Sequence, residues 1–246
     1  MLTNFTEFNR CRPDPSTVDY VTHGTTAIVH AADDLSVFQT LEALPQIFES
    51  AHGLAPGKPY RLGLTSIGAR SNPYGTTLTP NPGRKRLTLT DWDPRANALF
   101  GAAWLVGVAA AAADADIELL TLAGAGGPFG VLRGPGKVAP SFHVLSRLSL
   151  MQQHRRLHAK VSDPNIYVVA TTSDKRASII VANGCAQPKQ IQLTSSGRVA
   201  ILDAGTVPSA ASADWVERSL AAQSGLLDLQ PYAVAFIELD ALEETS

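Results

Sequence analysis

One stretch of the chain, VDYVTHGTTAIVHAADD from Val18 to Asp34, limits the possible fold more than any other. It begins with a short apolar segment that predicts a strand over Val18–His23, and it continues as a polar loop. An amphipathic helix follows at once, with apolar residues at helical spacing. Strand, polar loop and helix form one βα unit, and in a β/α barrel the chemistry collects in the loop after each strand.

The same pattern recurs and predicts a partial barrel. Further strands are expected at Thr3–Phe8, Tyr60–Ser66 and Ile117–Leu122, and helices at 35–53, 93–113 and 141–151. Pro45 predicts a kink in the first of these helices, because proline removes a backbone hydrogen bond. A closed barrel needs eight strands, so these four units are interpreted as the C-terminal half of a (β/α)8 barrel.

The pattern changes near residue 152. Short runs rich in β-branched residues follow one another, separated by turn signals such as Asp163-Pro164 and Asn183-Gly184. Several short strands at close spacing predict an antiparallel β-sandwich. The expected fold class is therefore α/β plus all-β, with a partial barrel over residues 1–152 and a sandwich over residues 153–246.

Composition excludes several classes of function. The net charge of −2 gives no electrostatic footprint for nucleic acid or an anionic membrane. The longest apolar run, Ala98–Ala113, is short for a membrane span. The glycines of AGAGGPFG do not have the spacing of a dinucleotide fingerprint. We therefore expect a cytoplasmic protein without a cofactor and with no nucleic-acid or membrane partner.

Several segments resemble a known family. FTEFNR, VDYVTHGTTAIVHAADD, TLEALP, YRLGLTSIGARSNPYG, DPRANALFGAAWLVG, LTLAGAGGPFGV and SFHVL are similar to the C-terminal portion of the D-apionate lactonase family. Members of that family hydrolyse the lactone of the branched sugar acid apionate. The resemblance implies a barrel followed by a β-sandwich, and a small sugar lactone as the substrate.

Opening a lactone requires an activated water and a donor for the carbonyl oxygen. At the expected strand ends we predict Glu7 as the base and His23 as the donor or proton shuttle. The residues expected to bind substrate lie in the same loops: Asn9, Arg10, His30, Asp33, Ser66, Arg70 and Asn72. Among these, Arg70 is predicted to clamp substrate oxygens. His30 with Asp33 or Asp34 has the chemistry of a metal site, but both aspartates are equally good helix caps, so no metal is expected.

Two other functions remain open. A glycoside hydrolase needs two carboxylates facing each other across the sugar bond, but YRLGLTS ends in Thr65-Ser66 without an acid. A non-catalytic or truncated remnant that serves binding or assembly is the other alternative. Because half a barrel exposes strand edges, we expect the chain to pair with a missing N-terminal half or to form a homo-oligomer.

Overall fold

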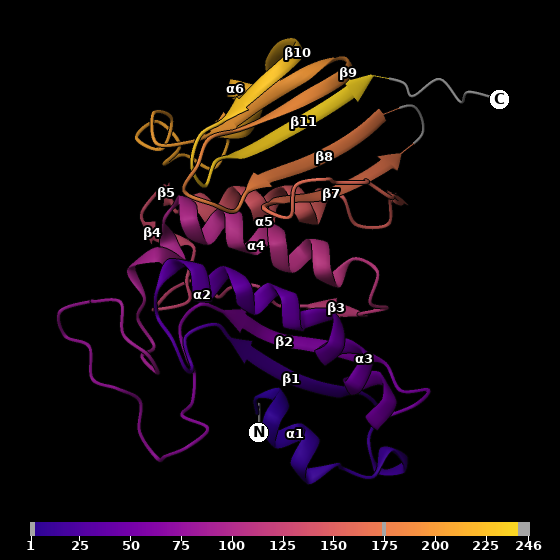
Figure 1. Ribbon diagram of the computed structural model, residues 1–246, viewed down its shortest axis with the longest axis vertical. Helices are drawn as coiled ribbons and strands as arrows, with labels where there is room; N and C mark the ends of the chain where they lie inside the picture. The colour runs from indigo at the N-terminus through magenta and orange to yellow at the C-terminus, as the bar shows by residue number, and fades with distance from the viewer. Residues whose placement is uncertain (1–2, 174–175, 241–246) are drawn as a thin grey trace. The chain divides into compact units, whose positions relative to one another are not determined.

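The computed structural model describes residues 3–173 and 176–240, and the chain divides into two compact units (Figure 1). The first unit comprises the chain up to Ala96 together with Ala111–Gly130. The second comprises Asn97–Ala110 and the chain from Val131 on. Each unit contains a sheet of its own.

A parallel sheet with the strand order β1-β2-β3 forms the centre of the first unit. Its strands are β1 (Val21–Thr26), β2 (Tyr60–Ser66) and β3 (Leu119–Leu120). Thr26 pairs with Ser66, so the C-terminal ends of β1 and β2 lie at the same edge of the sheet. Figure 1 shows a long loop projecting from this edge, directly after β2.

The strand predicted at Tyr60–Ser66 is confirmed to the residue, whereas the strands on either side of it differ. β1 begins at Val21 rather than Val18 and extends beyond His23 to Thr26, where its backbone still pairs with β2. β3 is shorter than the predicted Ile117–Leu122 and pairs with β2 only at Arg61 and Leu62.

The strand predicted at Thr3–Phe8 is wrong. Apart from a single parallel bridge between Asn4 and Gly24, this segment forms the helix α1 (Phe5–Cys11). The reason is a capping box: the Asn4 side chain accepts from the backbone of Glu7, and Glu7 Oε2 accepts from the backbone N–H of Asn4 at 2.9 Å. The described part of the first unit therefore has three named parallel strands instead of four.

The helical segment after β1 is broken, as Pro45 predicted. It consists of α2 (Asp34–Gln39), the 3₁₀-helix η2 (Thr40–Ala43) and α3 (Leu44–Leu54). Proline occupies the first turn of α3, where no backbone N–H is needed. Phe48 and His52 of α3 pack against the ring of Tyr60, with centroids 6.2 and 5.1 Å away, so α3 covers one face of the sheet.

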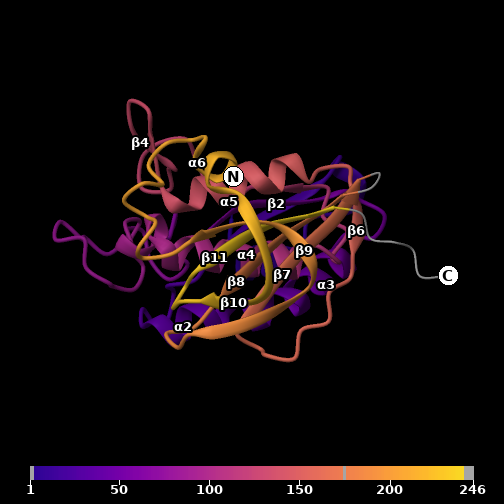
Figure 2. The ribbon, with the colours of Figure 1, turned by 90° about the horizontal axis from the view of Figure 1, so that it is seen from above.

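The second unit contains a six-stranded antiparallel sheet with the order β10-β9-β11-β8-β7-β6 (Figure 1). Figure 2 shows its strands from above. Its strands are β6 (Arg155–Leu157), β7 (Ile166–Ser173), β8 (Arg176–Asn183), β9 (Lys189–Leu202), β10 (Ala221–Leu229) and β11 (Val234–Asp240). Alternate residues such as Val181, Leu227 and Ile237 form its buried core. The fold class is confirmed: a partial β/α barrel region is followed by an antiparallel β domain.

The remaining elements are short or helical. They are η1 (Pro15–Thr17), η3 (Pro94–Asn97), α4 (Leu99–Ala112), β4 (Leu132–Gly134), β5 (Lys137–Val138), α5 (Pro140–Leu150) and α6 (Trp215–Ser219). Among the residues that the structure describes, no helix is both long and apolar enough to cross a membrane.

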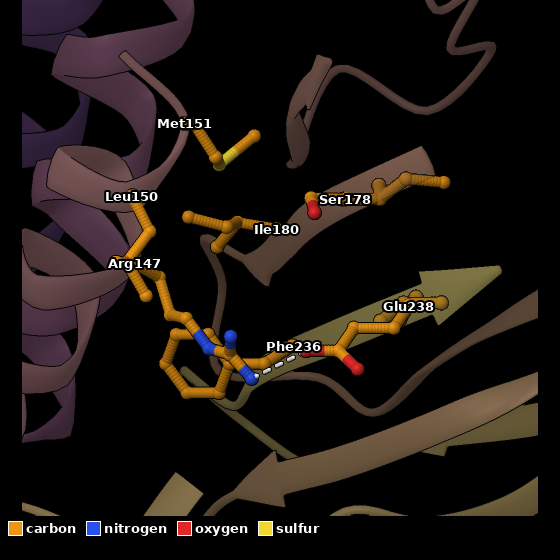
Figure 3. Close-up of a pocket in the computed structure, with 9 residues that line it drawn as sticks. Arg147, Leu150, Met151, Ser178, Ile180, Phe236 and Glu238 are labelled. Carbon is orange, nitrogen blue, oxygen red and sulfur yellow. Dashed lines mark hydrogen bonds and ion pairs between the residues drawn. The ribbon is translucent and has the colours of Figure 1, made fainter. Parts of the chain in front are cut away.

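Helix α5 lies against the sheet of the second unit. Arg147 of α5 donates to Glu238 of β11 at 3.0 Å, and Met151 and Phe236 line a small hollow beside this pair (Figure 3). The hollow has a volume of about 20 Å³. That is enough space for about one water molecule, so it is not a substrate site.

Candidate functional site at the rim of the parallel sheet

The loop between β2 and η3, residues 67–93, is fixed by backbone hydrogen bonds although it contains no regular element. Ala69 N–H donates to the carbonyl of Thr90 at 2.8 Å, and Leu89 N–H donates to the carbonyl of Ile28 at 2.8 Å. Gly68 lies so close to the Asp91 carbonyl that a Cβ would collide with it. The loop is therefore closed on itself and attached to the loop that follows β1.

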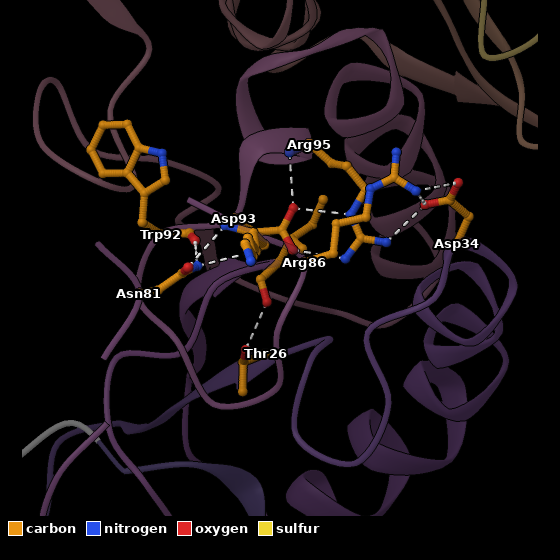
Figure 4. Close-up of polar contacts among 9 residues, drawn as sticks. Thr26, Asp34, Asn81, Arg86, Trp92, Asp93 and Arg95 are labelled. Carbon is orange, nitrogen blue, oxygen red and sulfur yellow. Dashed lines mark hydrogen bonds and ion pairs between the residues drawn. The ribbon is translucent and has the colours of Figure 1, made fainter. Parts of the chain in front are cut away.

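Side chains hold the far part of this loop together (Figure 4). The Asn81 amide donates to the carbonyl oxygens of Lys85 and Trp92, at 2.7 and 3.0 Å. The Arg84 guanidinium lies 4.2 Å above the Trp92 ring, within the range of a cation–π contact. Arg84 thus supports the loop through its contact with the Trp92 ring, and Lys85 through its backbone carbonyl.

A chain of ion pairs ties this loop to the start of α2 (Figure 4). Arg95 Nη2 donates to Asp93 Oδ2 at 2.7 Å, and both side chains are almost completely buried. Arg95 Nη1 also reaches Asp34 Oδ1 at 2.8 Å. Arg86 donates to both oxygens of the same Asp34 carboxylate at 3.0 Å. Asp34 therefore connects three segments of the first unit.

A cavity of about 320 Å³, called here the rim cavity, opens beyond the C-terminal end of β1. This volume lies at the lower end of the range for small-molecule sites. Its wall is mostly apolar, with hydroxyl, amide, imidazole and phenol groups. The lining residues are Asn4, Phe5, Thr6, Gly24, Thr25, Thr26, Ala27, Val29, His30, Ala31, Ser36, Thr40, Ala43, Ile47, Pro73 and Tyr74.

A second hollow, called here the inner hollow, adjoins the rim cavity. It has a volume of about 10 Å³ and is lined by Ser66 and Arg70 at the end of β2. The two spaces share Asn4 and the end of β1, Gly24–Thr26. Polar groups from β1, β2 and the segment before α1 therefore meet at one edge of the parallel sheet.

The structure brings three of the predicted site residues to this edge. Ser66 and Arg70 line the inner hollow, and His30 lines the rim cavity. Ser66 Oγ donates to the carbonyl of Gly68 at 2.7 Å, so its hydroxyl is engaged in a turn. Arg70 is exposed, and its guanidinium makes no hydrogen bond to any other residue that the structure describes.

Asn72 and Asp33 have structural roles. Asn72 Nδ2 donates to the carbonyl of Thr77 at 2.8 Å, and its Oδ1 accepts from the backbone of Tyr74 at 2.9 Å. Asp33 is the N-cap of α2 and accepts from the backbone of Ser36 at 2.9 Å. These Ser36 hydrogen bonds lower the pKa of the Asp33 carboxyl.

Glu7, Asn9 and Arg10 do not belong to this edge, because the segment predicted as a strand is the helix α1. The Glu7 carboxylate is used as a cap and accepts from Thr3 Oγ1 and the Asn4 backbone, both at 2.9 Å. Asn9 and Arg10 lie further along the helix and line neither of the two spaces. The predicted position of Glu7 at the end of a strand is therefore wrong.

His23 is also unavailable to a substrate, because its ring is fully buried. It stacks on Phe8 of α1 at 5.9 Å and contacts Tyr60 at 5.5 Å. Nδ1 donates to the carbonyl of Gly24 at 3.1 Å, so Nε2 accepts from Tyr60 Oη at 2.6 Å. Burial lowers the pKa of this imidazole despite the Gly24 hydrogen bond. The predicted position of His23 at the rim is therefore wrong.

The residue that the sequence reading missed is Tyr74. Its ring lies 5.7 Å from the ring of His30, and Tyr74 Oη is 3.2 Å from His30 Nε2. The two residues come from the loops after β1 and β2, 44 positions apart. The available signal was NPYG, an aromatic residue placed in a turn shortly after a strand end.

No group of three or more histidine, cysteine, aspartate or glutamate side chains that could hold a metal ion occurs in the described ranges. Asp34, one of the two aspartates considered with His30 as metal ligands, has its carboxylate engaged by Arg86 and Arg95.

Comparison with protein families gives two matches along the chain. The model for the TIM barrel domain of D-apionate lactonase matches residues 1–153. The model for the C-terminal immunoglobulin-like domain of D-apionate lactonase matches residues 164–237. The first match alone covers more than half of the chain.

Among curated proteins, the D-apionate lactonase of Brucella anthropi is 46% identical over 137 residues. The alignment covers 56% of this chain and 22% of the relative, so the chain spans about a fifth of that protein's length.

Two crystal structures are similar in fold. One is a glycoside hydrolase family 44 endoglucanase from Clostridium acetobutylium, with a TM-score of 0.56 and 9% identity over 91% of this chain and 47% of that one. The other is a glucosidase from Croceicoccus marinus, with a TM-score of 0.55 and 11% identity. It covers 97% of this chain and 56% of the glucosidase. At such identities the likeness concerns the fold alone. Both family models and the curated relative agree, and the chain belongs to the D-apionate lactonase family.

Proposed function

We propose that this chain acts in the opening of a sugar lactone by water, with the substrate bound at the rim of the parallel sheet. The observation that carries the proposal is the 46% identity to a D-apionate lactonase over 137 residues. The wall of the rim cavity supports it, because hydroxyl and amide groups on an apolar surface suit a small neutral sugar derivative.

Arg70 is assigned to the carbonyl oxygen of the lactone. A positive guanidinium at the strand end stabilises the negative charge that develops there when water attacks. His30 is assigned as the general base. In the tautomer that donates Nε2–H to Tyr74 Oη, Nδ1 remains the proton acceptor and can take a proton from the attacking water.

A glycosidase requires two carboxylates about 5 to 9 Å apart at the sugar bond. The described residues that line the rim cavity and the inner hollow include no aspartate and no glutamate. These spaces therefore provide neither acid of a glycosidase pair, whereas a histidine and an arginine are sufficient for the proposed lactone chemistry.

The test is a hydrolysis assay on the full chain with apionolactone and erythronolactone, following acid release with a pH indicator. Nitrophenyl glycosides serve as the alternative substrates. We expect saturable lactone opening, with kcat about a hundredfold lower in Arg70→Ala. Arg218→Ala, which removes an exposed arginine of the second unit, should retain full activity. Cleavage of glycosides without lactone opening, or no hydrolysis by a folded chain, would contradict the proposal.

A further inference from the structure

Tyr74 is the most exposed aromatic side chain at the rim cavity, and hydrogen bonds hold both its backbone and its phenol group. Its relative exposure is 62%. The backbone N–H donates to Asn72 Oδ1 at 2.9 Å, and Pro73 restricts the turn before it. The phenol oxygen lies 3.2 Å from His30 Nε2. An aromatic ring held by two loops is preorganised to receive a flat, apolar surface.

The described residues that line the rim cavity include no lysine, arginine, aspartate or glutamate. Thr25, Ser36 and Thr40 provide hydroxyl groups, and Asn4 provides an amide. A neutral ring that carries hydroxyl groups suits this wall, because it brings no charge that must be desolvated.

These two features bear directly on a lactone reaction. The substrate is a neutral ring whose C–H groups form an apolar face, whereas the product is an open-chain carboxylate. Resting on the proposed function, we propose that the rim cavity is a subsite for the intact, uncharged lactone ring. Tyr74 provides the stacking surface, and His30 holds the phenol in place. The subsite thus favours a closed ring over an open chain.

The proposal can be tested without catalysis, using ligand-observed NMR on the full chain. Anhydroerythritol is a neutral cyclic diol that cannot be hydrolysed, and erythritol is its open-chain counterpart. We expect anhydroerythritol to bind more tightly than erythritol. Tyr74→Ala should weaken binding of anhydroerythritol about threefold to tenfold. Tyr74→Phe should retain most of the affinity, because the ring remains.

Tyr20→Ala is the matched control, since Tyr20 is also exposed but lies under Arg61 and outside the rim cavity. It should leave anhydroerythritol binding unchanged. Equal binding of anhydroerythritol by wild type and Tyr74→Ala, or binding of erythritol as tight as that of anhydroerythritol, would overturn the subsite.

The test of the subsite can fail or succeed independently of the test of the proposed activity. A chain that binds anhydroerythritol through Tyr74 but opens no lactone retains the subsite and loses the activity. A chain that opens lactones with the same KM in wild type and Tyr74→Ala retains the activity and loses the subsite.

Discussion

Arg95 Nη1 lies 2.8 Å from Asp34 Oδ1, although the two residues are 61 positions apart in the chain. The bond joins η3 to the first turn of α2, which supplies Ser36 to the rim cavity. The same carboxylate accepts from Arg86 in the loop that supplies Tyr74. One aspartate thus ties together two walls of the candidate site.

The two arginines should differ strongly in their contribution to stability. The Arg95 side chain is 3% exposed and the Arg86 side chain is 54% exposed. Arg95→Leu leaves the buried Asp93 carboxylate unpaired, so we expect it to lower the free energy of unfolding by about 3 to 5 kcal/mol. Arg86→Ala should cost less than about 1 kcal/mol, because its ion pair is exposed. Urea unfolding monitored by circular dichroism measures both. Similar losses in the two variants would contradict this account of the network.

Substitution by alanine should change the stability of the chain in opposite directions at two glycines. At Gly68 a Cβ would collide with the backbone carbonyl of Asp91, whereas at Gly53 in α3 it meets nothing within 4 Å. We expect Gly68→Ala to destabilise the chain by about 1 to 3 kcal/mol by overpacking. Gly53→Ala should stabilise it by about 0.5 kcal/mol, because alanine favours the helix. Thermal unfolding of both variants checks the direction, and a neutral Gly68→Ala would show that the loop does not pack as described.

Stability should fall as the pH is lowered from about 7 to about 5. Burial lowers the pKa of His23, and it likewise lowers the pKa of His143, below the ordinary value of 6.5. In this window the unfolded chain binds protons that the folded chain does not, so the free energy of unfolding rises with pH. Each histidine contributes at most about 1.4 kcal/mol per pH unit.

His23→Gln provides the comparison, since it removes one of the two titrating rings. Its stability should depend less steeply on pH than that of the wild type in urea titrations at several pH values. A slope that is the same in both proteins would mean that His23 is not held neutral by burial.

Local signals in the sequence were sufficient for much of the fold. The strand Tyr60–Ser66 follows directly on Pro59. The break in the helical segment before α3 follows from Pro45, which has no backbone N–H to donate. The strand predicted at Thr3–Phe8 rests on weak alternation, whereas the capping box of Asn4 and Glu7 makes this segment a helix.

The candidate site was predicted less well, because it depends on contacts between distant loops. Ser66 and Arg70 were identified from their position after a strand. The pairing of Tyr74 with His30 has no periodic signal, since both lie in irregular segments. A strand that ended at His23 would put this residue at the rim, but the paired strand runs from Val21 to Thr26 and buries its third residue.

The most direct test of the central claim is to map where a sugar lactone binds. Amide chemical shifts of the full chain are recorded by NMR while erythronolactone is added. The account predicts that the shifted amides cluster at the ends of β1 and β2, in residues 24–31 and 70–75. Shifts confined to the second unit, or to the Asn9–Arg10 turn of α1, would contradict it.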